Sequence, residues 1–141
     1  MMLIDSFEIQ IINDLIELKP MNAWLQKTCE HLAVPESVAK DLDICANEAV
    51  ANIILYAYQD HEQHQITIGL ELKKDHTLSL IIQDDGKPFD PFKAILSGPY
   101  DKVGDVKIGG MGIQLMRSLA NECTYCRLND KNIISLSFHR C

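Results

Sequence analysis

The sequence predicts an α+β domain with two layers, in which helices pack on one face of a mixed, largely antiparallel sheet of about five strands. Apolar residues repeat at helical spacing in the first half and alternate as in strands after about residue 64. The order is one strand, two helices, two strands, a long loop, a helix and two strands, without regular β–α alternation. With 141 residues and 47% hydrophobic content, a single domain spanning 1–141 can bury one core.

The first half predicts one strand and two helices. Phe7–Ile12 is β-prone and alternates weakly. Apolar residues at helical spacing from 15 to 32 predict the first helix, and Pro20 suits its first turn, so we expect the helix proper to begin near Lys19. Pro35 suits the first turn of a second helix, which runs to about Tyr58. The buried stripe of that helix is expected to be Val38, Leu42, Cys45, Ala49, Ile53 and Tyr56.

The second half predicts two strand pairs separated by a loop and a helix. Residues 64–73 alternate and 78–83 form the return strand; the first buries Ile66, Ile68, Leu70 and Leu72 on one face. Residues 90–109 lose all periodicity, and so long a loop is more often functional, for instance a lid, than idle. A third helix at about 113–121 precedes a closing hairpin of strands 124–128 and 133–138.

Charge and cysteine content narrow the function classes. The net charge of −7 argues against a nucleic-acid partner, because phosphate binding needs clustered Lys and Arg. Five cysteines lack disulfide-like spacing, so we expect buried, reduced thiols. Cys123 and Cys126 form a CxxC, but no second pair completes a usual zinc site. No signal peptide or membrane-spanning run is evident, so we expect a cytoplasmic protein.

Two polar residues interrupt the apolar face of the second helix. Glu48 and Asn52 are four residues apart, so their side chains share one face, one turn apart. In one interpretation they are structural, with Glu48 solvated and Asn52 hydrogen-bonded. In the other they are chemical: an amide oxygen can bind Mg²⁺, and a nearby carboxylate can orient or deprotonate an attacking hydroxyl or water.

Two glycine-containing segments could complete such a site. Asp84 ends an apolar strand, so a fixed carboxylate there could accept a hydrogen bond from an exocyclic amine such as that of adenine. Gly86 would let the ring approach the backbone, although a plain turn is the alternative. Gly109, Gly110 and Gly112 precede the third helix, where backbone amides can face an anion. Tight packing at a helix entry is the alternative for these three.

These segments, in this order, resemble the N box and the two glycine boxes of the GHKL ATPase superfamily, which includes gyrase, histidine-kinase and mismatch-repair ATP domains. The matching segments are Glu48-x-x-x-Asn52, Asp84-x-Gly86-x-Pro88-Phe89-Asp90-Pro91 and Gly109-Gly110-Met111-Gly112-Ile113. Within the superfamily the chain is most similar to the anti-sigma-factor serine/threonine-protein kinases. Residues 109–138 resemble their final helix and hairpin, and the likeness covers nearly the whole chain.

The resemblance implies the Bergerat fold and an ATP- and Mg²⁺-dependent protein kinase. Glu48 matches the family's general base, Asn52 its magnesium ligand and Asp84 its adenine-reading aspartate, with Gly86 beside it. The three later glycines, Gly109, Gly110 and Gly112, match hinge and phosphate contacts of an ATP lid at about 90–110. Family members bind a sigma factor and phosphorylate a serine of an anti-anti-sigma (STAS-type) protein, often as homodimers.

Two departures from the family pattern concern catalysis. Many relatives carry His shortly after the asparagine, where this chain has Tyr56. The lid contains Lys93, Lys102 and Lys107 but no Arg. Where some relatives hold the γ-phosphate with an Arg, a Lys would have to act as a point charge. Neither departure removes nucleotide binding, but both bear on the rate and on the phosphate acceptor.

Three functions are open from the sequence. The first is a kinase that acts as an anti-sigma switch. The second is a non-catalytic ATP-binding module that switches a protein partner other than a sigma factor. The third is an ATP-binding domain that serves a phosphorelay or another regulator. Glu48 favours the first, because a module without chemistry needs no carboxylate there. We do not expect a complete histidine kinase, because the chain shows no helix hairpin with a phospho-accepting His.

Overall fold

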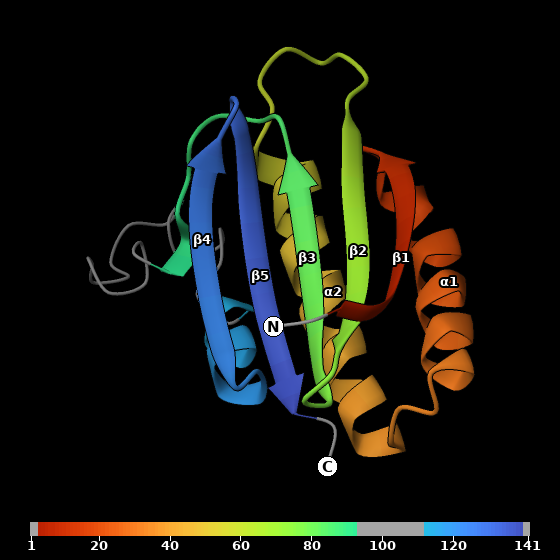
Figure 1. Cartoon of the computed structure of the whole chain (residues 1–141). Helices are drawn as coiled ribbons and strands as arrows, with labels where there is room; N and C mark the ends of the chain where they lie inside the picture. The colour runs from red at the N-terminus through yellow and green to blue at the C-terminus, as the bar shows by residue number, and fades with distance from the viewer. Residues whose placement is uncertain (1–2, 93–111, 140–141) are drawn as a thin grey trace.

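The computed structural model describes residues 3–92 and 112–139. They form a five-stranded sheet with helices on one face, which confirms the predicted two-layer α+β class (Figure 1). The expectation of a mixed sheet is wrong for the described strands, because every pair is antiparallel. For the first two strands, the two long helices between them account for this: the chain runs back along one helix and forward along the next, so the second strand runs opposite to the first.

The first half contains one strand and three helical segments. They are β1 (Leu3–Ile12), the 3-10 turn η1 (Leu15–Glu17), α1 (Leu18–His31) and α2 (Glu36–Tyr56). With Pro20 in its first turn, the first helix was expected to begin near Lys19, and α1 begins at Leu18. The preceding apolar residues form η1, a separate turn capped by the Asp14 side chain, which accepts a hydrogen bond from the Ile16 N–H at 3.1 Å.

The second half contains four strands and, among the described residues, two helical stretches. The strands are β2 (Gln65–Lys73), β3 (Thr77–Asp84), β4 (Glu122–Leu128) and β5 (Lys131–His139), and residues 91–92 and 112–119 are helical. The sheet order is β1-β2-β3-β5-β4. Asn129 and Asp130 both have positive φ, of 52° and 62°, in the two-residue turn between β4 and β5. Residues 93–110 of the predicted lid lie outside the described part.

The core lies between the sheet and the helices. The alternating inward residues of three central strands are buried: Ile66, Ile68, Leu70 and Leu72 of β2, Leu78, Leu80 and Ile82 of β3, and Ile134, Leu136 and Phe138 of β5. From the stripe predicted on α2, Leu42, Cys45, Ala49 and Ile53 are buried, whereas Val38 and Tyr56 are only half-buried. Burial raises the pKa of the Cys45 thiol to about 12, so this thiol is a neutral core group.

Among the described helices, none is long and apolar enough to cross a membrane.

Candidate functional site

Two inward-facing apolar stripes of the sheet each end in a polar residue. On β3 the stripe ends at Asp84, and on β5 it ends at Asn132. The two residues are cross-strand partners, and each is only 3% exposed. The sequence predicted the sheet placement of Asp84 but assigned Asn132 to a hairpin loop. One signal in the sequence could have placed Asn132 on the inward face of the strand: it continues the alternation of Ile134, Leu136 and Phe138.

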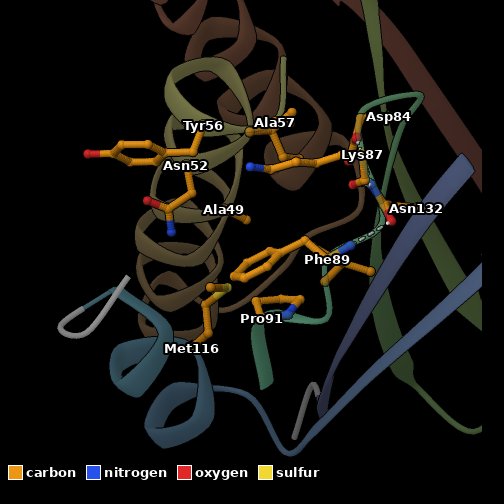
Figure 2. A pocket seen from close by; sticks show the side chains of 12 residues that line it. Ala49, Asn52, Tyr56, Ala57, Asp84, Lys87, Phe89, Pro91, Met116 and Asn132 are labelled. Atoms are coloured by element: carbon orange, nitrogen blue, oxygen red, sulfur yellow. Dashed lines mark hydrogen bonds between the residues drawn. The ribbon is translucent and has the colours of Figure 1, made fainter. Parts of the chain in front are cut away.

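Asp84 and Asn132 form one wall of a pocket whose opposite wall is the C-terminal part of α2 (Figure 2). The lining residues are Ala49, Asn52, Ile53, Tyr56, Ala57, Asp84, Lys87, Phe89, Pro91, Met116, Asn132 and Ile134. The structure thus places Asn52 and Asp84, which are far apart in sequence, in one cavity. Figure 2 shows the Phe89 ring directed toward Ala49 and Met116, so apolar groups flank the polar end.

Two N–H groups hold one carboxylate oxygen of Asp84. Its Oδ1 accepts hydrogen bonds from the Gly86 N–H at 2.8 Å and from Asn132 Nδ2 at 3.0 Å. Burial is the largest influence and raises the pKa of Asp84 above its ordinary value, while these two hydrogen bonds limit the rise. Oδ2 has no hydrogen-bond partner among the described residues, so it remains available as an acceptor for a ligand.

The loop after Asp84 is anchored on both sides. The Lys87 N–H donates to the Ala57 carbonyl at the end of α2, at 3.2 Å. Arg127 on β4 donates from Nη1 to the Gly86 carbonyl at 2.8 Å. A Cβ on Gly86 would lie 2.6 Å from the Ala57 Cβ and 2.7 Å from the Ala57 oxygen. Close packing against α2 therefore gives Gly86 a structural role beside the one predicted.

Glu48 lies one turn before Asn52 and contacts the start of the last helical segment. A Cβ on Gly112 would lie 2.7 Å from Glu48 Oε2 and 3.2 Å from its Cδ. The structure therefore brings the predicted base next to the predicted glycine, although Glu48 does not line the pocket itself. Gly109 and Gly110 lie outside the described residues, and their roles stay predictions.

The CxxC does not form one site within the described chain. Cys123 is half-buried, and its thiol donates to the Met116 carbonyl at 3.6 Å, while Cys126 is exposed. Burial raises the pKa of the Cys123 thiol. These positions agree with the alternation of a strand, which turns the two side chains to opposite faces.

The residues of the pocket fit a purine nucleotide. A flat ring could lie among Ala49, Met116 and Phe89, with Asp84 Oδ2 as the acceptor for an amine. The described residues contain no cluster of three His, Cys, Asp or Glu side chains that could hold a metal. Asn52 lines the pocket and carries an amide oxygen, a kind of ligand that Mg²⁺ accepts together with phosphate oxygens and water.

A profile of the histidine kinase-like ATPase domain matches residues 11–138. The chain belongs to this family. It is 32% identical over 121 residues to the serine/threonine-protein kinase BtrW of Bordetella bronchiseptica, covering 82% of this chain and 81% of BtrW. It is 33% identical over 87 residues to the serine-protein kinase RsbW of Oceanobacillus iheyensis. That match covers 59% of this chain and 54% of RsbW, so it spans about half the length of that relative.

Solved structures share the fold at low sequence identity. The RsbU and RsbW domains of Rv1364c from Mycobacterium tuberculosis superpose with a TM-score of 0.71 at 13% identity, over 96% of this chain and 32% of that one. The SiaB–SiaC complex from Pseudomonas aeruginosa gives a TM-score of 0.69 at 14% identity, over 96% and 89%. Within the family, the sequence matches place the chain among the serine/threonine-protein kinases.

Proposed function

We propose that this protein is an ATP- and Mg²⁺-dependent serine/threonine-protein kinase that acts as an anti-sigma regulatory factor. It would phosphorylate a serine of an anti-anti-sigma (STAS-type) protein and sequester a sigma factor, as a cytoplasmic homodimer. One observation carries the proposal. Asn52 and Asp84 line the same pocket, and Glu48, one turn before Asn52 on α2, lies in contact with Gly112. Similarity to the kinases BtrW and RsbW supports a protein serine as the acceptor.

Each side chain has a separate task in this proposal. Asp84 accepts a hydrogen bond from the adenine amine through Oδ2 and so positions the nucleotide. Asn52 supplies an oxygen ligand to the metal. Glu48 takes the proton of the attacking serine hydroxyl, as a general base. ATP supplies the transferred phosphoryl group and leaves as ADP, and Mg²⁺ held at Asn52 would neutralise charge on the phosphates.

The first test separates metal binding from proton transfer. Asn52→Ala should lose the Mg²⁺-dependent part of ATP binding, because it removes the metal ligand. Glu48→Ala should keep that binding but slow phosphoryl transfer by roughly 10²–10⁴-fold, the range for a general base. Titration calorimetry with ATP, with and without Mg²⁺, measures the first effect. Intact-mass spectrometry of candidate STAS proteins measures the second.

Full phosphorylation by Glu48→Ala would exclude Glu48 as the base. Unchanged Mg²⁺-dependent binding in Asn52→Ala would exclude Asn52 as the metal ligand. If the unvaried protein binds ATP but no candidate gains a phosphoryl group, the non-catalytic module becomes the better assignment. Co-purification from the native cell, followed by mass spectrometry for a sigma factor or a STAS protein, tests the two partners.

A further inference from the structure

The Asn132 side chain uses its whole hydrogen-bonding capacity at the base of the pocket. Its Nδ2 donates to Asp84 Oδ1 at 3.0 Å and to the Lys87 carbonyl at 2.8 Å. Its Oδ1 accepts from the Tyr125 hydroxyl at 2.6 Å and, at 3.4 Å, from the Phe89 N–H. Two donors and two acceptor sites are all that a carboxamide has, so this buried group is fully satisfied.

Backbone groups fix which way this amide points. The Lys87 carbonyl can only accept and therefore requires Nδ2. The Phe89 N–H can only donate and therefore requires Oδ1. A flipped amide would place two acceptors together at Lys87 and two donors together at Phe89. The Asn132 group that faces Asp84 is consequently a donor.

The orientation of Asn132 determines what Asp84 can recognise. Asp84 Oδ1 faces two N–H donors, those of Asn132 and Gly86, so a proton on Oδ1 would have no acceptor. Both contacts stabilise the ionised carboxylate, which only accepts hydrogen bonds, and so oppose the rise in the pKa of Asp84 that its burial causes. The free Oδ2 then suits an amine on the base. It does not suit a carbonyl at the same position, because two acceptors would meet.

We propose that Asn132 is a specificity-determining positioning residue: it holds Asp84 in acceptor-only form and so selects a purine with an exocyclic amine over one with a carbonyl. This inference rests on the proposed nucleotide site. Asn132 acts through Asp84, while Tyr125 supports Asn132 from β4 without contacting Asp84 itself. Selectivity for the base therefore depends on a residue of the C-terminal hairpin.

Inosine triphosphate tests the proposal, because it carries a carbonyl where ATP carries the amine. Dissociation constants for both nucleotides are measured by calorimetry on the wild-type protein and on the variants Asn132→Ala and Asn132→Asp. We expect the preference for ATP over inosine triphosphate to fall by about tenfold or more in both variants, the scale of a lost hydrogen bond to a charged group. In Asn132→Asp, a second carboxylate would face Asp84 and favour its protonation, and a proton on Oδ2 would provide a donor for the carbonyl.

The ratio of the two dissociation constants separates a loss of base selectivity from a general loss of nucleotide affinity. Arg127→Lys is the matched control, since it keeps the positive charge but removes the guanidinium that binds the Gly86 carbonyl. It should change both constants together and leave the ratio within about twofold, because Asp84 keeps its donors. Tyr125→Phe supplies an intermediate variant if Asn132→Ala or Asn132→Asp fails to fold by circular dichroism. It should lower the preference by a smaller factor.

The outcomes distinguish this inference from the proposed function. Suppose that the wild-type protein binds ATP and that the Asn132 variants, or Tyr125→Phe in their place, keep the preference for ATP over inosine triphosphate. The role of Asn132 is then wrong, and the nucleotide site stands. If the unvaried protein binds neither nucleotide, the proposed function is wrong and this inference falls with it.

Discussion

At the scale of single residues, the contact between Gly112 and Glu48 restricts where the carboxylate can lie. The helical segment that starts near Gly112 passes so close to α2 that hydrogen is the only side chain that fits without movement. The atom in the way is the far end of a flexible side chain, so a larger residue would displace Glu48 rather than unfold the helix. The consequence should therefore appear in activity before it appears in stability.

Gly112→Ala should reduce phosphoryl transfer by about 10²-fold, because displacement of a catalytic group by about an ångström has that effect. The added Cβ would stand 2.7 Å from Glu48 Oε2. Single-turnover kinetics on the acceptor protein measure the rate, and urea unfolding checks stability. Gly69→Ala is the matched control, since its Cβ would meet its nearest neighbour at an ordinary 3.7 Å. A Gly112→Ala enzyme as fast as the Gly69→Ala enzyme would contradict the placement of Glu48.

At the scale of elements, His64 ties the connection between α2 and β2 to the loop after Asp84. Its Nε2 lies 2.8 Å from Asp60 Oδ2 and its Nδ1 lies 3.2 Å from Asp85 Oδ1. The imidazole also stacks on the Tyr58 ring, with centroids 4.2 Å apart. The hydrogen bond to Asp60 and, after it, the one to Asp85 raise the pKa of His64, while desolvation opposes them. Protonated imidazole satisfies both carboxylates, because both its nitrogens then donate.

The His64 connection should stabilise the fold most under mildly acidic conditions. A pKa raised by folding gives stability that is complete below the unfolded value of about 6.5 and is lost as the pH rises through the folded pKa. The free energy of unfolding of His64→Gln should therefore differ most from that of the unvaried chain near pH 5.5, and the difference should shrink toward about pH 8.5. Urea titrations across this range measure it.

His61→Asn controls for loss of a nearby histidine. His61 is exposed in the same connection and has a positive φ of 58°, which asparagine tolerates. The difference in the free energy of unfolding between His61→Asn and the wild-type protein should not follow the same trend with pH. A constant difference between His64→Gln and the unvaried chain would mean that protonation of His64 contributes nothing to stability.

At the scale of the whole molecule, the central strands both build the core and carry the site. β3 lies between β2 and β5, and its Leu80 is fully buried on the stripe that leads to Asp84. The partner of Leu80 on β5 is Leu136, four residue pairs along the ladder from the pair of Asp84 and Asn132 and on the same inward face. Packing of this stripe and placement of the polar pair at its end are therefore consequences of one strand register.

Leu80→Ala should lower the free energy of unfolding by about 2–5 kcal/mol, the range for truncating a fully buried leucine. This is a large share of the roughly 5–15 kcal/mol that holds a typical domain together. Leu128→Ala, at a residue that is 58% exposed, should change it by no more than about 0.5 kcal/mol. Guanidinium unfolding followed by circular dichroism compares the two, and equal losses would contradict the assigned core.

Local patterns were sufficient to predict most elements. Alternation from Ile66 to Leu72 predicted a strand buried on one face, and the structure confirms it. The spacing of Glu48 and Asn52 predicted a shared helix face for the same reason, because side-chain direction follows from the period of the backbone. The predicted nucleotide roles of Asn52 and Asp84 remain proposals, but their shared pocket was the arrangement that those roles require.

The sequence by itself determined the periods of the helices and strands and the polar interruptions within them, because both are encoded in neighbouring residues. Only the tertiary structure decided that Asn132 pairs with Asp84, that Gly112 lies against Glu48 and that Gly86 lies against Ala57. These pairs join residues far apart in the chain. Strand register and helix packing are set by burial of the whole core, so no local pattern around Asn132 identifies its partner.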